Sequence, residues 1–237
     1  MNGLAAALSE ADEVARAVGQ SAPRARVALC PPATLIARMA ERLAGSAVLV
    51  GGQDCHTEMS GAFTGDTSAE MLADAGARLV ILGHSERRAM HGETDAVVAA
   101  KVLGALRGGL EPIVCVGESL DERRAGQAID RVRAQLQGSL PDALATRSFA
   151  IAYEPVWAIG SGLTPTLAEI EAVHGAIREA LRARFVDHGA ARPILYGGSV
   201  KASNAAEILA VENVGGALVG GASLKAVDFL PIVAAAG

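Results

Sequence analysis

The chain has 237 residues, with 21 basic and 26 acidic side chains and a formal net charge of −5. This length fits one large domain or two small ones. Hydrophobic residues at 51% and charged residues at 20% are typical of a folded globular protein and argue against a disordered chain. Because the net charge is negative and no basic stripe is present, we expect no binding to nucleic acid.

No stretch of the sequence fits a membrane-spanning helix. The longest segment without a charged residue has 14 residues, from Pro155 to Ala168, and it contains Pro, Gly, Ser and Thr. A spanning helix needs roughly 20 apolar residues, so no membrane association is expected. The three cysteines, Cys30, Cys55 and Cys115, match no zinc pattern. Together with the acidic N-terminal segment, this predicts a cytoplasmic protein without a metal ion.

Strands and helices are predicted to alternate along the chain. An amphipathic helix comes first, because apolar residues from Leu4 to Val18 recur on one face. Seven apolar segments then predict buried parallel strands, at 26–30, 47–51, 78–82, 112–116, 149–153, 193–196 and 216–219. Further helices are expected at 33–44, 68–76, 94–108, 119–138, 166–187, 202–210 and 224–235.

This alternation predicts an α/β fold, either a doubly wound sheet or a (β/α)8 barrel. No linker or change of composition divides the chain, so one domain spanning 1–237 is expected. A barrel needs eight strands to close, whereas seven strands and eight helices are counted here. The pattern therefore favours a (β/α)8 barrel whose first β-strand is missing from this chain.

Two chemically distinctive side chains follow predicted strands. His84 comes just after the strand at 78–82, and Glu154 comes directly after the strand at 149–153. Functional residues of a barrel gather where its strands end, so we expect the two to lie over one site. Glu154 fits a general base, and His84 fits a neutral hydrogen-bond donor to a carbonyl oxygen. Either residue alone is equally well explained by a structural role, and only the pair favours catalysis.

Two Gly-Gly turns follow the last two predicted strands, at 197–198 and 220–221. Glycine lets backbone N–H groups approach a ligand, and a helix N-terminus behind them favours an anion. One such pair is explained as a tight turn, but two pairs at these strand ends favour a phosphate site.

The segment Pro155–Pro165 is predicted to be a lid. It has proline at both ends, glycine inside and an apolar body. A loop of this kind can close over a ligand and exclude water. A static surface loop with a partly buried Trp157 is the alternative.

Five segments of the sequence resemble the triosephosphate isomerase family, in the family's order along essentially the whole chain. They are residues 61–65, 80–88, 152–160, 196–200 and 218–224. The resemblance implies a TIM barrel that interconverts dihydroxyacetone phosphate and D-glyceraldehyde 3-phosphate in glycolysis and gluconeogenesis, with no metal or organic cofactor. An isomerase of a four-carbon sugar phosphate and a non-catalytic phosphate-binding barrel are the alternatives.

The same resemblance implies roles for single residues. Glu154 would move a proton between adjacent carbons, His84 would polarise the carbonyl group, and Glu86 matches a family residue near the site. Phosphate would be bound by backbone N–H groups of Gly160, Ser199, Gly220 and Gly221. The lid would consist of Pro155, Val156, Trp157, Ala158, Ile159, Gly160, Ser161 and Gly162.

The polar stretch 53–67 is long for a loop inside a compact barrel. In the family this loop inserts into a second subunit. A homodimer is therefore implied, with Phe63, Thr64 and Gly65 at the contact. A flexible surface loop is the alternative.

The chain departs from the family at its start. Family members begin with a strand that ends in an Asn and a Lys reaching the substrate, whereas this chain opens at Met1. None of Lys101, Lys201 and Lys225 matches the family lysine. Either the natural protein begins upstream of Met1, or the chain is a non-catalytic relative. The intact remainder of the site favours the first explanation.

A smaller departure lies at the far hinge of the lid. In the family, the hydroxyl group corresponding to Tyr196 holds the closed lid through a backbone N–H. The aligned hinge residue here is Pro165, which has no N–H. This contact must therefore be replaced or weakened.

Overall fold

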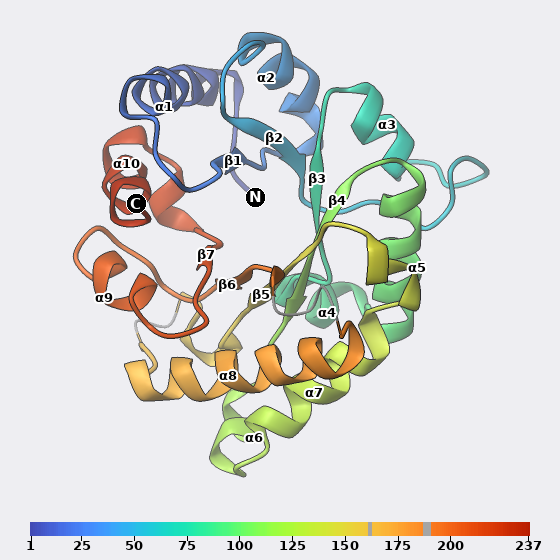
Figure 1. Cartoon of the computed structure of the whole chain (residues 1–237). Coiled ribbons are helices and arrows are strands. Elements are labelled where there is room, and N and C mark those ends of the chain that lie inside the picture. Colours follow the sequence, from blue (N-terminus) through green and yellow to red (C-terminus); the bar gives the residue numbers. More distant parts are fainter. Residues whose placement is uncertain (161–162, 187–190) are drawn as a thin grey trace.

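The computed structural model describes residues 1–160, 163–186 and 191–237. Its centre is a parallel sheet of seven strands, paired in sequence order (Figure 1). The strands are β1 (Ala28–Leu29), β2 (Leu49–Gly52), β3 (Leu79–Leu82), β4 (Glu111–Val116), β5 (Ala150–Tyr153), β6 (Ile194–Tyr196) and β7 (Gly216–Ala217). All seven predicted strands are thus confirmed, with β1 and β7 shorter than expected.

Helices surround the curled sheet on its outside (Figure 1). The α-helices are α1 (Leu8–Ser21), α2 (Ile36–Arg42), α3 (Ala69–Asp74), α4 (Ser85–His91), α5 (Asp95–Arg107), α6 (Leu120–Arg124), α7 (Ala128–Ser139), α8 (Leu167–Arg184), α9 (Ala205–Leu209) and α10 (Ala226–Ala235). Short 3-10 turns connect several of them, among them η4 (Val156–Ala158) and η6 (Gly221–Ser223).

The prediction of one helix at 119–138 is wrong, because the structure has two helices there, α6 and α7. Gly126 between them has a φ of 73°, a left-handed conformation that ends a helix. A capping box at Ser119 and Glu122 starts α6. The chain therefore turns here instead of continuing as one helix.

Apolar packing covers both faces of the sheet. Outward side chains such as Val80, Val114 and Ile151 join the large cluster formed with the helices. A smaller cluster of Ile81, Cys115 and Ala152 lies on the other face, inside the curl. Because both faces are buried, the strands are continuous apolar segments, as parallel strands of a barrel usually are.

The sheet ends at β1 on one side and at β7 on the other. A cavity of about 630 Å³ is lined by residues of both edge strands, together with inward side chains such as Ile113 and Leu195. The barrel described here is therefore open along one seam, in agreement with the seven strands predicted.

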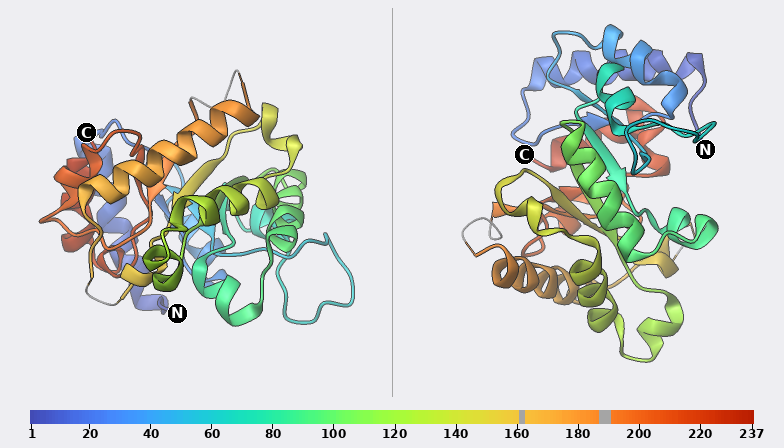
Figure 2. Two further views of the ribbon diagram at one scale, coloured as in Figure 1. Left: turned by 90° about the horizontal axis from the view of Figure 1, so that it is seen from below. Right: turned by 90° about the vertical axis from the view of Figure 1, so that its right-hand side faces the viewer.

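The segment 53–67 lies between β2 and α3 and projects away from the body of the molecule (Figure 2). Phe63, Thr64 and Gly65 at its tip are exposed. Among the described helices, none is long and apolar enough to cross a membrane.

Candidate active site

His84 and Glu154 meet above the ends of β3 and β5. His84 Nε2 lies 2.8 Å from Glu154 Oε1. Ser85 also contacts this carboxylate, since its backbone N–H donates to Oε2 at 2.9 Å and its hydroxyl donates to Oε1 at 3.2 Å. The predicted pairing of the two side chains is thus present in the structure. The contact of Ser85 with Glu154 was not predicted from the sequence. Its position directly after His84 was the signal that could have indicated it.

The helix α4 determines which nitrogen of His84 faces Glu154. His84 is the N-cap of α4, and its Nδ1 accepts a hydrogen bond from the backbone N–H of Glu86 at 3.3 Å. A nitrogen that accepts carries no proton, so the proton of the neutral ring is on Nε2. Glu86 itself is exposed at the start of the helix.

Two opposing effects act on the charge of His84. Burial lowers the pKa of the imidazole, but the hydrogen bond and the negative charge of Glu154, with a contribution from Glu86, outweigh burial and raise it. The accepting Nδ1 favours the neutral ring. The charge state of His84 therefore depends on where the carboxylate of Glu154 points.

Glu154 is enclosed by backbone rather than by bulky side chains. Only 1% of the residue is exposed. A methyl group on Gly117 would overlap its backbone carbonyl oxygen, and one on Gly197 would lie 3.0 Å from its Cγ. Cys115 lies beside the carboxylate, and burial together with the charge of Glu154 raises the pKa of this thiol. Gly117 thus makes room for the backbone of Glu154, and Gly197 makes room for its side chain.

The first turn of the predicted lid packs on a buried carboxylate that sequence reasoning missed. Trp157 Nε1 donates to Glu118 Oε1 at 2.8 Å, and the Tyr153 hydroxyl donates to the same oxygen at 3.1 Å. Arg123 Nε lies 3.1 Å from it as well. Glu118 is fully buried and follows β4, so its place at a strand end was the signal that could have indicated it.

Phosphate binding was predicted at the two glycine turns, which follow β6 and β7. Gly197 N donates to Tyr153 O at 2.7 Å, which brings the end of β6 beside the end of β5. Gly220 is the N-cap of η6. A methyl group added at Gly220 or Gly221 would have no atom within 4 Å, so the space beside both glycines is open. Gly160 in the lid has a φ of 67°. Ser161 and Gly162, also predicted for the lid, lie outside the described residues.

Two of the three lysines are bound in ion pairs with glutamates. Lys101 Nζ lies 2.6 Å from Glu93, and Lys225 Nζ lies 3.0 Å from Glu10. Within the described ranges, no group of three or more His, Cys, Asp and Glu could hold a metal ion.

A parallel barrel that brings a buried carboxylate and an imidazole together at its strand ends defines an enzyme of the acid–base type. Residues 1–236 match the triosephosphate isomerase family. The triosephosphate isomerases of Bradyrhizobium diazoefficiens and Caulobacter vibrioides are similar to this chain, at 57% and 58% identity. These matches cover 98% and 99% of this chain and 92% and 93% of the relatives.

A solved structure agrees with these relatives. The crystal structure of triosephosphate isomerase from Bartonella henselae has a TM-score of 0.93 to this chain, with 46% sequence identity. It covers 99% of this chain, which in turn covers 94% of it. The chain belongs to the triosephosphate isomerase family. The TIM-barrel fold and the isomerase class predicted from sequence are confirmed, and these relatives support neither of the two alternative functions.

Proposed function

We propose that this chain interconverts dihydroxyacetone phosphate and D-glyceraldehyde 3-phosphate, with Glu154 as the base and His84 as the partner of the substrate oxygens. The observation that carries this proposal is the 2.8 Å contact between His84 Nε2, after β3, and Glu154 Oε1, after β5, at the same end of the sheet. Both groups face the same space, so a substrate bound between them has a base on its carbon and a donor on its oxygen.

The protons balance without a cofactor. The Glu154 carboxylate removes a proton from C1 of dihydroxyacetone phosphate. His84 donates the proton on its Nε2 to the C2 oxygen. The C1 hydroxyl then returns a proton to His84, and Glu154 protonates C2. A general base of this kind contributes about 10²–10⁴-fold to the rate.

The carboxylate has to turn before it reaches a substrate. In the described conformation Glu154 accepts hydrogen bonds from Ser85 and contacts His84. When Glu154 turns to the substrate carbon, the interaction that raises the pKa of His84 is removed. The helix amide on Nδ1 then favours a neutral ring, which suits a donor to a carbonyl oxygen.

The phosphate is proposed to bind at the two glycine turns. Backbone N–H groups of Ser199, Gly220 and Gly221 would donate to its oxygens, and Gly160 would join them when the lid closes. Side chains of larger residues would fill the open space beside Gly220 and Gly221. Closure would exclude water and protect the enediolate.

The loop 53–67 supports a homodimer. Phe63 is 42% exposed and Met59 is 56% exposed on this projecting loop, and packing against a second subunit would cover both side chains. We propose that the loop packs against a second subunit, that residues 1–237 act as one domain, and that the protein is cytoplasmic. Three free cysteines fit a reducing compartment.

A coupled isomerase assay with glyceraldehyde 3-phosphate tests the proposal. Glu154→Gln keeps the shape of the side chain but removes the base, and should lower kcat by about 10²–10⁴-fold. Glu207→Gln, an exposed glutamate on α9, is the matched control and should leave kcat unchanged.

Binding of 2-phosphoglycolate, a phosphorylated mimic of the enediolate, separates catalysis from phosphate binding. Turnover together with binding supports the isomerase. Binding without turnover would make the chain a phosphate-binding barrel and would overturn the proposed activity. Loss of inorganic phosphate binding in Glu154→Gln, to the same degree as loss of turnover, would show that Glu154 is structural.

A further inference from the structure

The helix that carries His84 is not held by apolar packing. All seven residues of α4 lie in the described part of the chain, and none of them is fully buried. A helix of this length is marginal without tertiary contacts. The direction of the His84 ring, which caps this helix, must therefore be fixed by polar contacts.

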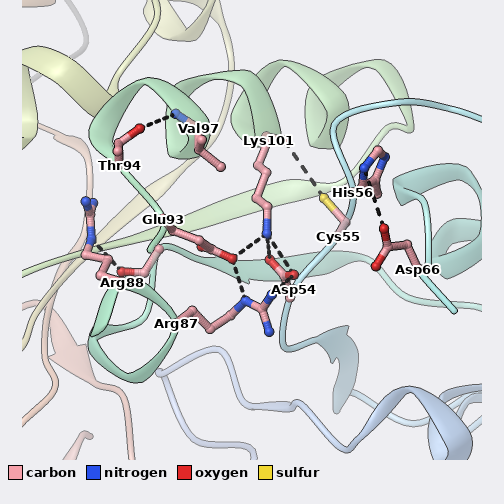
Figure 3. Close-up of polar contacts among 11 residues, drawn as sticks. Asp54, Cys55, His56, Asp66, Arg87, Arg88, Glu93, Thr94, Val97 and Lys101 are labelled. Atoms are coloured by element: carbon pink, nitrogen blue, oxygen red, sulfur yellow. Dashed lines mark hydrogen bonds and ion pairs between the residues drawn. The ribbon is translucent and has the colours of Figure 1, made fainter. Parts of the chain in front are cut away.

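Four charged side chains supply such contacts on one side of α4. Glu93 Oε1 accepts from Arg87 Nε at 2.7 Å and from Lys101 Nζ at 2.6 Å. Asp54 Oδ1 and Oδ2 lie 2.7 and 2.8 Å from the same Lys101 nitrogen. A guanidinium nitrogen of Arg87 lies 2.8 Å from Asp54 Oδ2 and completes the circle. We call these four residues the charge ring, and Figure 3 shows them pointing toward one another.

The charge ring connects four parts of the chain. Lys101 is buried on α5, whose apolar residues are packed in the core, so α5 is the fixed support. Asp54 belongs to the loop that follows β2, and Glu93 lies between α4 and α5. Arg87 lies on α4, and its backbone N–H donates to the carbonyl oxygen of His84 at 2.8 Å. A shift of Arg87 is therefore passed directly to His84.

The four charges compensate one another. Burial raises the pKa of Asp54 in spite of Lys101, whereas Lys101 and Arg87 outweigh burial and lower the pKa of Glu93. Glu93 is thus the more firmly ionised acid of the two. Removing one member leaves a buried partner without its counter-charge, which is the costly way to break such a network.

We propose that Arg87 is a positioning residue: through the charge ring it fixes α4, and thereby the direction in which His84 presents Nε2 to Glu154. This inference rests on the proposed role of His84. Arg88 holds the other side of α4, with its Nε donating to Gly83 O at 2.8 Å and its Nη1 lying 2.6 Å from Asp95 Oδ1. Arg87 is the member that joins α4 to the loop 53–67.

Arg87→Ala tests the proposal, with NMR of the labelled imidazole groups as the first measurement. The Nε2–H signal of His84, assigned by its loss in His84→Gln, should vanish or shift in Arg87→Ala. Arg87→Lys keeps a cation near Glu93 and should restore it. In the isomerase assay, Arg87→Ala should lower kcat by about 10²-fold while KM changes little, as expected for a misplaced catalytic group.

Arg107→Ala is the matched control. Arg107 also anchors the loop, since it donates to Thr57 O at 3.1 Å and pairs with Glu70, but these partners are not on α4. The control should keep the His84 signal and kcat. A His84 signal that is unchanged in Arg87→Ala, or changed equally in Arg107→Ala, would overturn the proposal.

Glu93→Gln covers the case in which Arg87→Ala does not fold. It keeps the shape of the side chain and opens the charge ring, so it too should shift the His84 signal. An unchanged signal in folded Glu93→Gln would also overturn the proposal. Because the NMR measurement needs no turnover, it stays informative even if the parent chain shows no isomerase activity and the proposed function fails.

Discussion

A buried histidine other than His84 should make the fold sensitive to acid. His174 on α8 is fully buried, and its ring lies 5.8 Å from Tyr153 and 6.4 Å from Tyr196. Nδ1 is 3.3 Å from the carbonyl oxygen of Asn213, so the neutral ring carries its proton there. Burial and, to a smaller degree, the positive charge of Arg178 lower the pKa of His174 to about 4. The hydrogen bond to Asn213 raises the pKa but does not outweigh burial.

The magnitude follows from the difference between the folded and unfolded chains. A histidine in an unfolded chain has a pKa of about 6.5. The native value of about 4 is lower, so the unfolded state binds more protons between these two pH values. Stability therefore falls as the pH falls through this window. The complete loss is about 3 kcal/mol, of which about 2 kcal/mol falls between pH 7 and pH 5.

Urea unfolding of the parent chain and of His174→Gln, at pH 7, 6 and 5, measures this loss. Glutamine can donate to Asn213 but does not titrate, so the variant should lose about 2 kcal/mol less than the parent from pH 7 to pH 5. His91→Gln, at an exposed histidine on α4, should follow the parent. Parallel pH curves for the parent and His174→Gln would refute the reasoning.

Three further changes test the site. Glu154→Asp moves the carboxylate back by about 1 Å and should lower kcat by about 10²-fold, while inorganic phosphate still binds; equal loss of both would contradict a role as base. Gly117→Ala would overlap the backbone of Glu154 and should cost about 1–3 kcal/mol on urea unfolding, whereas an unchanged stability would show that this backbone shifts freely. Trp157→Phe removes the bond to Glu118, so hydrogen exchange at residues 158–159 should rise about tenfold, and equal exchange would exclude this bond as a restraint on the lid.

The strands could be predicted because their signal is local. Each has a short apolar sequence bounded by glycine, proline or polar residues, and burial on both faces explains that pattern. The shortness of β1 and β7 could not be predicted, because pairing at the edges of a sheet depends on the neighbouring strand. The division at Gly126 depends on one left-handed residue within an otherwise helical pattern.

The site was predictable only in part for a similar reason. His84 and Glu154 could be paired because both follow strands of one barrel. Their supporting contacts depend on which strand ends are neighbours in space. Glu118 follows β4, which pairs with β5, and this neighbourhood brings it under Trp157. Sequence spacing does not contain that information.

The two hinges of the proposed lid differ in the contacts that hold them. Its near hinge is held in the described state, because Val156 N donates to Glu118 O at 3.1 Å and Trp157 donates to the carboxylate of the same residue. At the far hinge, Pro165 has no N–H to donate. Within the described residues the Tyr196 hydroxyl is buried without a hydrogen-bond partner.

The proposed closure must therefore draw its stabilisation from the ligand. Moving Trp157 away would leave the buried Glu118 carboxylate short of one donor, a cost of about 1–3 kcal/mol. Pro165 cannot offset this cost through Tyr196, so the proposed contact between Gly160 and the phosphate has to exceed it. Proline at both ends reduces the number of conformations that the open lid can adopt, which lowers the entropy lost on closing. We therefore expect the proposed lid to close when phosphate is bound and to open when it leaves.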